Sequence, residues 1–150
     1  MASFVFDKVK ERIAKGEINF DGNENLKLAL VDESFWSVAA LKNQEKWVTG
    51  GIKGFEIHEE GGYTGAVDLE NVVVEFNQAT QYEYNAYVKC DDVTFGTNTT
   101  ISARGAVVYE DDEEDDGNLI CAIDFGGNVS SSNGVYEINF DWYKGFLKLS

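Results

Sequence analysis

Hydrophobic positions near the start of the chain repeat with the period of a helix. The apolar residues of this stretch recur every three or four positions: Val5, Phe6, Val9 and Ile13. Such spacing places them on one face of an α-helix, with the charged residues between them on the other. Gly16 follows the last of them, and glycine commonly ends a helix at that place. The pattern predicts one short N-terminal helix over about residues 4–15.

From Leu26 onward the hydrophobic period changes to two. Leu26, Leu28 and Leu30 alternate with other residue types, which is the pattern of a β-strand. Further strand-like segments follow at short intervals: residues 66–69, 72–76, 82–90, 93–95, 101–109, 119–125, 135–142 and 146–149. Short strands at this spacing predict a mainly β protein, an antiparallel β-sandwich of the jelly-roll type. The expected organisation is a single β-sandwich domain over residues 1–150.

Two of the expected strands carry distinct burial patterns. In residues 135–142 one face is aromatic and aliphatic: Tyr136, Ile138, Phe140 and Trp142. The other face of that strand is mostly polar, so one side is expected to be buried and the other solvated. Residues 119–123 are apolar on both faces. That strand should be covered from both sides, either by a second sheet and the N-terminal helix or by a neighbouring subunit.

Residues 33–62 show no clear periodicity and are expected to form a long irregular insertion. Gly50, Gly51 and Gly54 interrupt them, and a short strand is possible only at 55–58. The segment is longer than a connection between strands usually needs. It is therefore a candidate for contacts with another molecule.

The net charge of the chain disfavours two classes of binding partner. The 27 acidic residues outnumber the 12 basic ones, and the net charge is −15. Such a field repels nucleic-acid phosphates and anionic lipids, so neither nucleic acid nor membrane is expected as a partner. No run approaches the roughly 20 apolar residues of a membrane span. The charged N-terminus does not look like a secretory signal, which predicts synthesis in a cytoplasm with Cys90 and Cys121 as free thiols.

The most conspicuous polar motif is the unbroken acidic run at residues 110–116, between two expected strands. Calcium loops also gather carboxylates, because Ca²⁺ prefers several oxygen ligands. Those loops normally separate their ligands and contain a glycine at a sharp turn. Adjacent carboxylates repel one another, so the preferred interpretation is a solvated hairpin loop, with the calcium loop as the alternative.

Candidate catalytic chemistry is confined to His58, the only histidine, which lies among Glu56, Glu59 and Glu60. A histidine paired with a carboxylate can act as a general base or hold a metal. No nucleophile motif, second histidine or phosphate-binding loop accompanies it, and a site needs several converging groups. The sequence therefore predicts no enzyme, no catalytic or cofactor-binding residues, no metal ligands and no cofactor.

Aromatic side chains outside the clearest core faces suggest a different kind of site. The candidates for stacking on sugar rings are Trp36, Trp47, Tyr63 and Tyr143. A carbohydrate-binding module is the hypothesis that follows from them. The alternative is that these rings pack beneath the long insertion or at a subunit interface, which is the preferred interpretation.

Two stretches of the chain contain an ordered series of sequence blocks. In residues 6–32, the helix-like FDKVKERIAKGEINF leads into the strand LKLALVD. In residues 62–149 the blocks are, in order, GYTGAVDLENVVVEF, CDDVTF, ARGAVVYEDD, NLICAIDFGG and YEINFDWYKGFLKL. In the order and spacing of these structural blocks, and not in a catalytic motif, the chain resembles a family of small tailed-bacteriophage virion proteins. Residues 33–61 depart from the family pattern, and the acidic run is longer.

The resemblance implies a structural protein of the virion, most plausibly a capsid decoration or cement protein. Such a protein is made in the bacterial cytoplasm and resides on the outer capsid surface. Its implied partners are the major capsid protein and other copies of itself, as a homotrimer. A tail or head-fibre component is the nearest alternative, and a carbohydrate-binding module is the alternative from another class.

Overall fold

Antiparallel strands make up most of the secondary structure. The computed structural model describes residues 3–37, 41–80, 83–111, 117–140 and 146–149. The longer strands are β2 (Leu26–Val31), β5 (Val73–Thr80), β6 (Glu83–Lys89), β8 (Ser102–Glu110) and β9 (Gly117–Ser130). The shorter strands are β1 (Phe4–Val5), β3 (Lys46–Trp47), β4 (Val67–Asp68), β7 (Val93–Thr94), β10 (Glu137–Ile138) and β11 (Leu147–Leu149). The prediction of a mainly β, antiparallel chain is confirmed.

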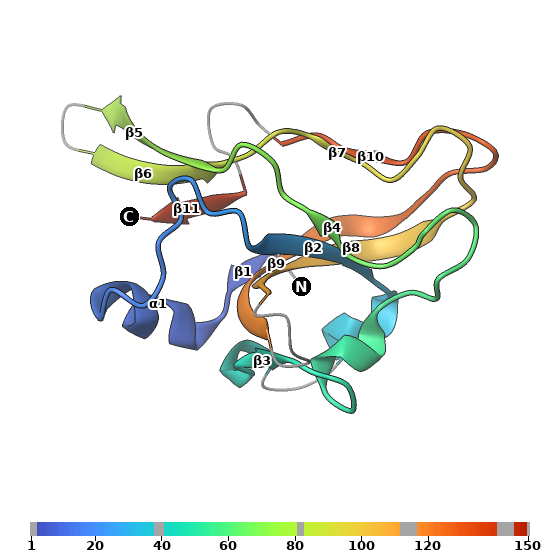
Figure 1. Cartoon of the computed structure of the whole chain (residues 1–150), viewed down its shortest axis with the longest axis horizontal. Coiled ribbons are helices and arrows are strands. Elements are labelled where there is room, and N and C mark those ends of the chain that lie inside the picture. The colour runs from blue at the N-terminus through green and yellow to red at the C-terminus, as the bar shows by residue number, and fades with distance from the viewer. Residues whose placement is uncertain (1–2, 38–40, 81–82, 112–116, 141–145, 150) are drawn as a thin grey trace.

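The strands form one large sheet and two small ones. The large sheet has six strands in the order β1-β9-β8-β2-β4, with β3 also paired to β9. Strands β11, β6 and β5 form a three-stranded sheet, and β10 pairs with β7. In the view of Figure 1 the β5–β6 hairpin and the β7–β10 ribbon lie above the large sheet, and α1 lies below it.

The helix α1 (Asp7–Ala14) is shorter than the expected range. Its end is as predicted: Gly16 has a φ of 72°, and its N–H donates to the Ile13 carbonyl at 3.0 Å. Its start was predicted wrongly, since Phe4 and Val5 belong to β1. These two residues pair with Ala122 and Cys121 of β9, because an extended backbone can satisfy its polar groups along that strand.

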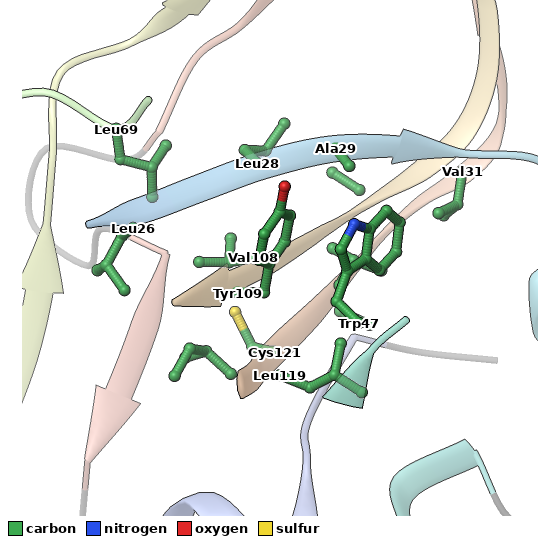
Figure 2. Close-up of a cluster of buried hydrophobic side chains, with 14 of the residues drawn as sticks. Leu26, Leu28, Ala29, Val31, Trp47, Leu69, Val108, Tyr109, Leu119 and Cys121 are labelled. Atoms are coloured by element: carbon green, nitrogen blue, oxygen red, sulfur yellow. The ribbon is translucent and has the colours of Figure 1, made fainter. Parts of the chain in front are cut away.

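Both faces of the central strands are covered by this chain itself. On one face of the large sheet, the Trp47 ring stacks on Tyr109 of β8 with 5.1 Å between centroids. Val108 points to the opposite face, as does Cys121, its partner in the β8–β9 register. On that face the Cys121 thiol donates to the Phe146 carbonyl, beside β11, with 4.0 Å between sulfur and oxygen. Figure 2 shows this cluster of buried side chains. The predicted cover on both sides is confirmed for residues 119–122, which the chain's own elements bury, whereas Ile123 is only half-buried.

The described parts of the insertion, residues 33–37 and 41–62, are mostly irregular, as predicted. They contain the 3₁₀ helices η1 (Glu33–Ser37), η2 (Leu41–Asn43) and η3 (Ile52–Phe55), together with β3. The expected strand at 55–58 is reduced to one bridge between Glu56 and Val31. The apolar side chains of this insertion that lie in the core are Phe35, Trp36, Trp47 and Ile52. The insertion therefore buries its aromatic surface within this chain.

Within residues 135–140, the described part of the expected strand at 135–142, regular strand pairing is confined to Glu137–Ile138. Its burial still alternates, because Tyr136 and Ile138 are buried whereas Val135, Glu137 and Asn139 are exposed. Trp142 lies outside the described residues. The period-two pattern thus predicted the buried face correctly but overestimated the length of the paired strand.

Candidate functional site

Two cavities with mostly apolar linings lie along β9 and share lining residues, and together they form what we call the β9 groove. The larger cavity has a volume of about 510 Å³ and is lined by Ser3, Phe4, Val5, Cys121, Ala122, Ile123, Phe125, Ile138, Asn139, Phe140, Phe146 and Leu147. The smaller one has a volume of about 220 Å³ and is lined by Phe125, Val129, Tyr136, Glu137, Ile138 and Asn139. The two share Phe125, Ile138 and Asn139. Most of the lining is aliphatic or aromatic, so the groove can accept apolar side chains.

A large bulge in β9 shapes this groove. Ala103 of β8 lies opposite Val129, and Gly105 lies opposite Asp124, so residues 125–128 face only Arg104. A bulge bends its strand and redirects the side chains near it. Within it, Gly126 has a φ of 83° and donates its N–H to Asp124 Oδ1 at 2.8 Å. The bend puts Phe125 on the boundary between the two cavities.

The opposite wall of the groove comes from the end of the chain. Phe140 and Phe146 contact each other edge to face, with 6.1 Å between ring centroids. The Phe140 N–H donates to Asp92 Oδ1 at 2.8 Å, which ties this wall to the segment before β7. The wall is therefore held by a hydrogen bond as well as by packing.

The chemistry of the groove favours binding. Burial raises the pKa of the Cys121 thiol to about 12, so this sulfur is protonated at neutral pH and is a weak nucleophile. At the bulge, Arg104 Nε donates to Asp124 Oδ1 at 2.9 Å, and this hydrogen bond lowers the pKa of that carboxyl. Val129 and Val135 are 44% and 53% exposed. Of these residues only Cys121 and Val129 line the groove, which therefore contains a neutral thiol and an exposed aliphatic side chain, and Asp124 lies beside it in the bulge.

A second, polar cavity surrounds the sequence candidate His58. It has a volume of about 350 Å³, and its ionisable lining residues are Asp32, Glu56, His58 and Glu60. The Glu56 carboxylate accepts the Tyr63 hydroxyl proton at 2.6 Å, and the Tyr63 oxygen accepts the Leu30 N–H at 3.2 Å. Burial raises the pKa of Glu56, and burial together with the Glu56 hydrogen bond raises that of Tyr63. Glu56 therefore anchors the insertion to β2, and His58 lies exposed at the rim.

The aromatic residues considered for sugar binding are in the core. Trp36, Trp47 and Tyr63 are 9%, 3% and 1% exposed. The Trp36 ring occupies the space above Gly105, and Figure 2 shows Trp47 beside Tyr109 inside the cluster. None of these three rings presents a face to solvent, so the sugar-stacking alternative is wrong for them and the preferred interpretation, in which they pack inside the molecule, is confirmed. Tyr143 lies outside the described residues.

The acidic run at 110–116 is described only at its first two residues. Glu110 ends β8 and accepts the Asn23 side-chain N–H at 3.1 Å. Asp111 donates its backbone N–H to the Asn25 carbonyl at 2.7 Å, and its carboxylate lies 4.0 Å from Lys27 Nζ. The run thus leaves the sheet between β8 and β9, as the hairpin prediction requires; residues 112–116 lie outside the described part.

Nothing among the described side chains gathers three or more histidine, cysteine or carboxylate groups in a way that could hold a metal ion. Within the same residues no helix is long and apolar enough to span a membrane.

The sequence missed the groove residues on β9. Phe125 and Val129 gave no signal beyond ordinary strand alternation, because their exposure follows from the bulge opposite Arg104. The one local hint was the glycine pair Gly126-Gly127 inside a strand pattern, which often marks a bulge. No family model, no curated protein sequence and no solved structure matches this chain.

Proposed function

We propose that the protein is a non-enzymatic structural component of a tailed bacteriophage virion, a decoration or cement protein on the outer surface of the head. The observation that carries the proposal is the β9 groove, a mostly apolar surface that includes the exposed Val129, on a molecule of net charge −15. The resemblance of residues 6–32 and 62–149 to small virion proteins is the second support for the proposal, because it implies that the surface binds another protein of a virus particle.

The proposed mechanism is adhesion to the major capsid protein. Burying apolar surface contributes about 25 cal/mol per Å² removed from water, so a partner side chain seated against Phe125 and Phe140 would stabilise the contact. The acidic exterior disfavours a position against packaged DNA. It leaves the outer face of the shell as the suitable location, with the protein synthesised in the host cytoplasm.

The proposed architecture and assembly extend beyond the strand pairing. We infer a jelly-roll-like β-sandwich, since both faces of the large sheet are covered and α1 with the insertion adds a layer on one of them. Copies of the chain are proposed to associate with one another, and three is the number that the resemblance implies. Native mass spectrometry of the purified protein counts them.

Copy number in purified particles tests the location. Densitometry of a stained gel against the major capsid protein should give a number of copies comparable to that of the shell subunit. A few copies per particle would instead place the protein in the tail or head fibres. Complete loss of the protein from washed particles would contradict a virion role.

A charge placed in the groove tests the surface itself. Val129→Glu, at an exposed position, should abolish binding to particles produced without the protein, because the carboxylate would have to be desolvated in an apolar contact. Thr64→Glu adds the same charge at an exposed position outside the groove and should bind like the wild type. Equal binding by both variants would exclude the β9 groove as the contact surface.

A further inference from the structure

Strand β5 is a long strand, and one of its edges has no neighbouring strand among the residues that the structure describes. It forms the border of the three-stranded sheet β11-β6-β5, and it runs over eight residues. Val73 and Val74 at its start are 38% and 37% exposed, and successive residues point to opposite faces, so both faces of the strand are open there. Figure 1 shows the β5–β6 hairpin extending beyond the large sheet at the upper left.

The backbone hydrogen bonds at the start of β5 establish which groups face outward. The Val74 N–H donates to Asp21 Oδ1 at 3.0 Å, and the Val72 carbonyl accepts the Gly22 N–H at 2.8 Å. Neither partner belongs to β6, so residues 72 and 74 direct their polar backbone groups away from the hairpin. Along an antiparallel strand, every second residue directs its backbone N–H and C=O groups to the same edge. The backbone groups of residues 76 and 78 therefore also point outward.

Beyond Val74 the chain provides no strand for this edge within the residues that the structure describes. Asp21 and Gly22 cover only the first outward-facing groups of β5. An open edge of this kind is a template for another strand, and proteins usually blunt such edges with charge, proline or a bulge. Here the register irregularity comes only after Gln78, which leaves the segment from Val74 to Gln78 regular.

The charge distribution identifies the occupant. Residues 73–89 contain three charged residues, Glu75, Glu83 and Lys89, with a net charge of −1, and the rest of the chain carries −14. Glu75 is itself neutralised by Lys89, whose Nζ lies 2.5 Å from its carboxylate. Two copies of so acidic a protein repel each other over most of their surfaces, but much less at this hairpin.

We propose that β5 pairs antiparallel with β5 of a second copy around a twofold axis, joining the two three-stranded sheets into one of six strands. An edge pairing with itself gives an isologous contact, in which both copies use the same surface. A twofold contact joins copies in pairs, and in a threefold assembly it joins copies of neighbouring trimers. The contact is separate from the β9 groove and does not depend on the virion role.

The test uses the full-length chain and two substitutions at one outward-facing position. Gln78→Pro removes the outward N–H without removing a bond to β6, and proline is tolerated on edge strands. Gln78→Ala keeps the N–H and is the matched control. Sedimentation over a range of concentrations should give even-numbered assemblies for the wild type and for Gln78→Ala. Gln78→Pro should raise the dissociation constant at least about tenfold.

Hydrogen exchange adds a readout specific to the backbone. The amides of Phe76 and Gln78 in the wild type should exchange more slowly as the protein concentration rises, and near-UV circular dichroism should show that each variant remains folded. A wild type that is monomeric at every concentration would overturn the proposal, and so would an unchanged assembly in Gln78→Pro. A trimer that is insensitive to Gln78→Pro would also overturn it, while leaving the proposed capsid function intact.

Discussion

The insertion at residues 33–62 combines an irregular backbone with buried side chains, whereas the β5–β6 hairpin combines a regular backbone with exposed side chains. The insertion has little regular structure, yet Phe35 and Trp47 are buried in the core. The hairpin forms a regular ladder from Val73↔Lys89 to Gln78↔Tyr84, yet Val73 and Val74 are exposed. Backbone pairing therefore does not indicate where stability resides. Large apolar side chains stabilise an irregular segment, whereas the regular hairpin has one edge that no strand of the described residues covers.

The largest expected difference between the two regions comes from removing an aromatic ring. Trp47→Ala should lower the free energy of unfolding by about 3–5 kcal/mol, since the ring is buried and stacks on Tyr109. Val73→Ala in the hairpin should cost less than about 1 kcal/mol. Urea unfolding followed by far-UV circular dichroism measures both. Equal losses would contradict the view that the insertion is part of the core.

A smaller effect is expected where the insertion packs on the sheet. A Cβ at Gly105 would lie 2.0 Å from Trp36 Cη2 and 2.2 Å from the Ile123 carbonyl oxygen. Gly105→Ala should therefore cost about 1–3 kcal/mol through overpacking. Gly54→Ala is the control, because a Cβ at Gly54 meets nothing within 4 Å. If both variants have the same melting temperature, the sheet and the Trp36 ring are not closely packed at this point.

The anchoring of the insertion by Glu56 should depend on pH. Burial raises the pKa of this carboxyl above its value of 4.5 in the unfolded chain. Its contribution to stability is therefore present below pH 4.5 and is lost as the pH rises through the folded-state pKa. Glu56→Gln keeps an acceptor for the Tyr63 hydroxyl and should gain stability relative to the wild type between pH 4 and pH 7.

Thermal unfolding of wild type and variant at both pH values measures this change. The exposed Glu60→Gln should shift the melting temperature by similar amounts at the two pH values. A Glu56→Gln variant that loses stability relative to the wild type on going from pH 4 to pH 7 would contradict the assigned direction.

The smallest effect concerns the base of the hairpin. Asp21→Ala removes the acceptor of the Val74 N–H, and the loss should be about 0.5 kcal/mol because water can replace it at this exposed position. Asp21→Asn keeps an oxygen at the same place and should retain most of the stability. Faster hydrogen exchange of the Val74 amide in Asp21→Ala alone would show that the loss of stability comes from this hydrogen bond. The same exchange rate in all three proteins would argue against this hydrogen bond in solution.

Local periodicity was sufficient for the element types. Alternation at Leu26–Val31 and the apolar run at 119–123 predicted strands that the structure contains, and Gly16 marked the end of the helix. These features depend on residues close in sequence, because helix and strand periods arise from the backbone of a single segment. Phe4 and Val5 were assigned wrongly for the complementary reason, since their partner is β9, more than a hundred residues away.

The candidate sites depended almost wholly on tertiary contacts. Nothing local to Trp36 or Tyr63 distinguishes a buried ring from an exposed one, and it is Gly105 and Glu56 that receive them. The β9 groove likewise arises because the bulge opposite Arg104 meets Phe140 and Phe146 from the chain end.

The sequence by itself determined the acidic charge, the mainly β composition and the positions of most strands, because these follow from residue type and short-range spacing. Tertiary structure alone decided which strand edges are paired, which aromatic rings are enclosed and where apolar surface remains open. The physical reason is that burial and strand pairing depend on segments brought together from distant parts of the chain.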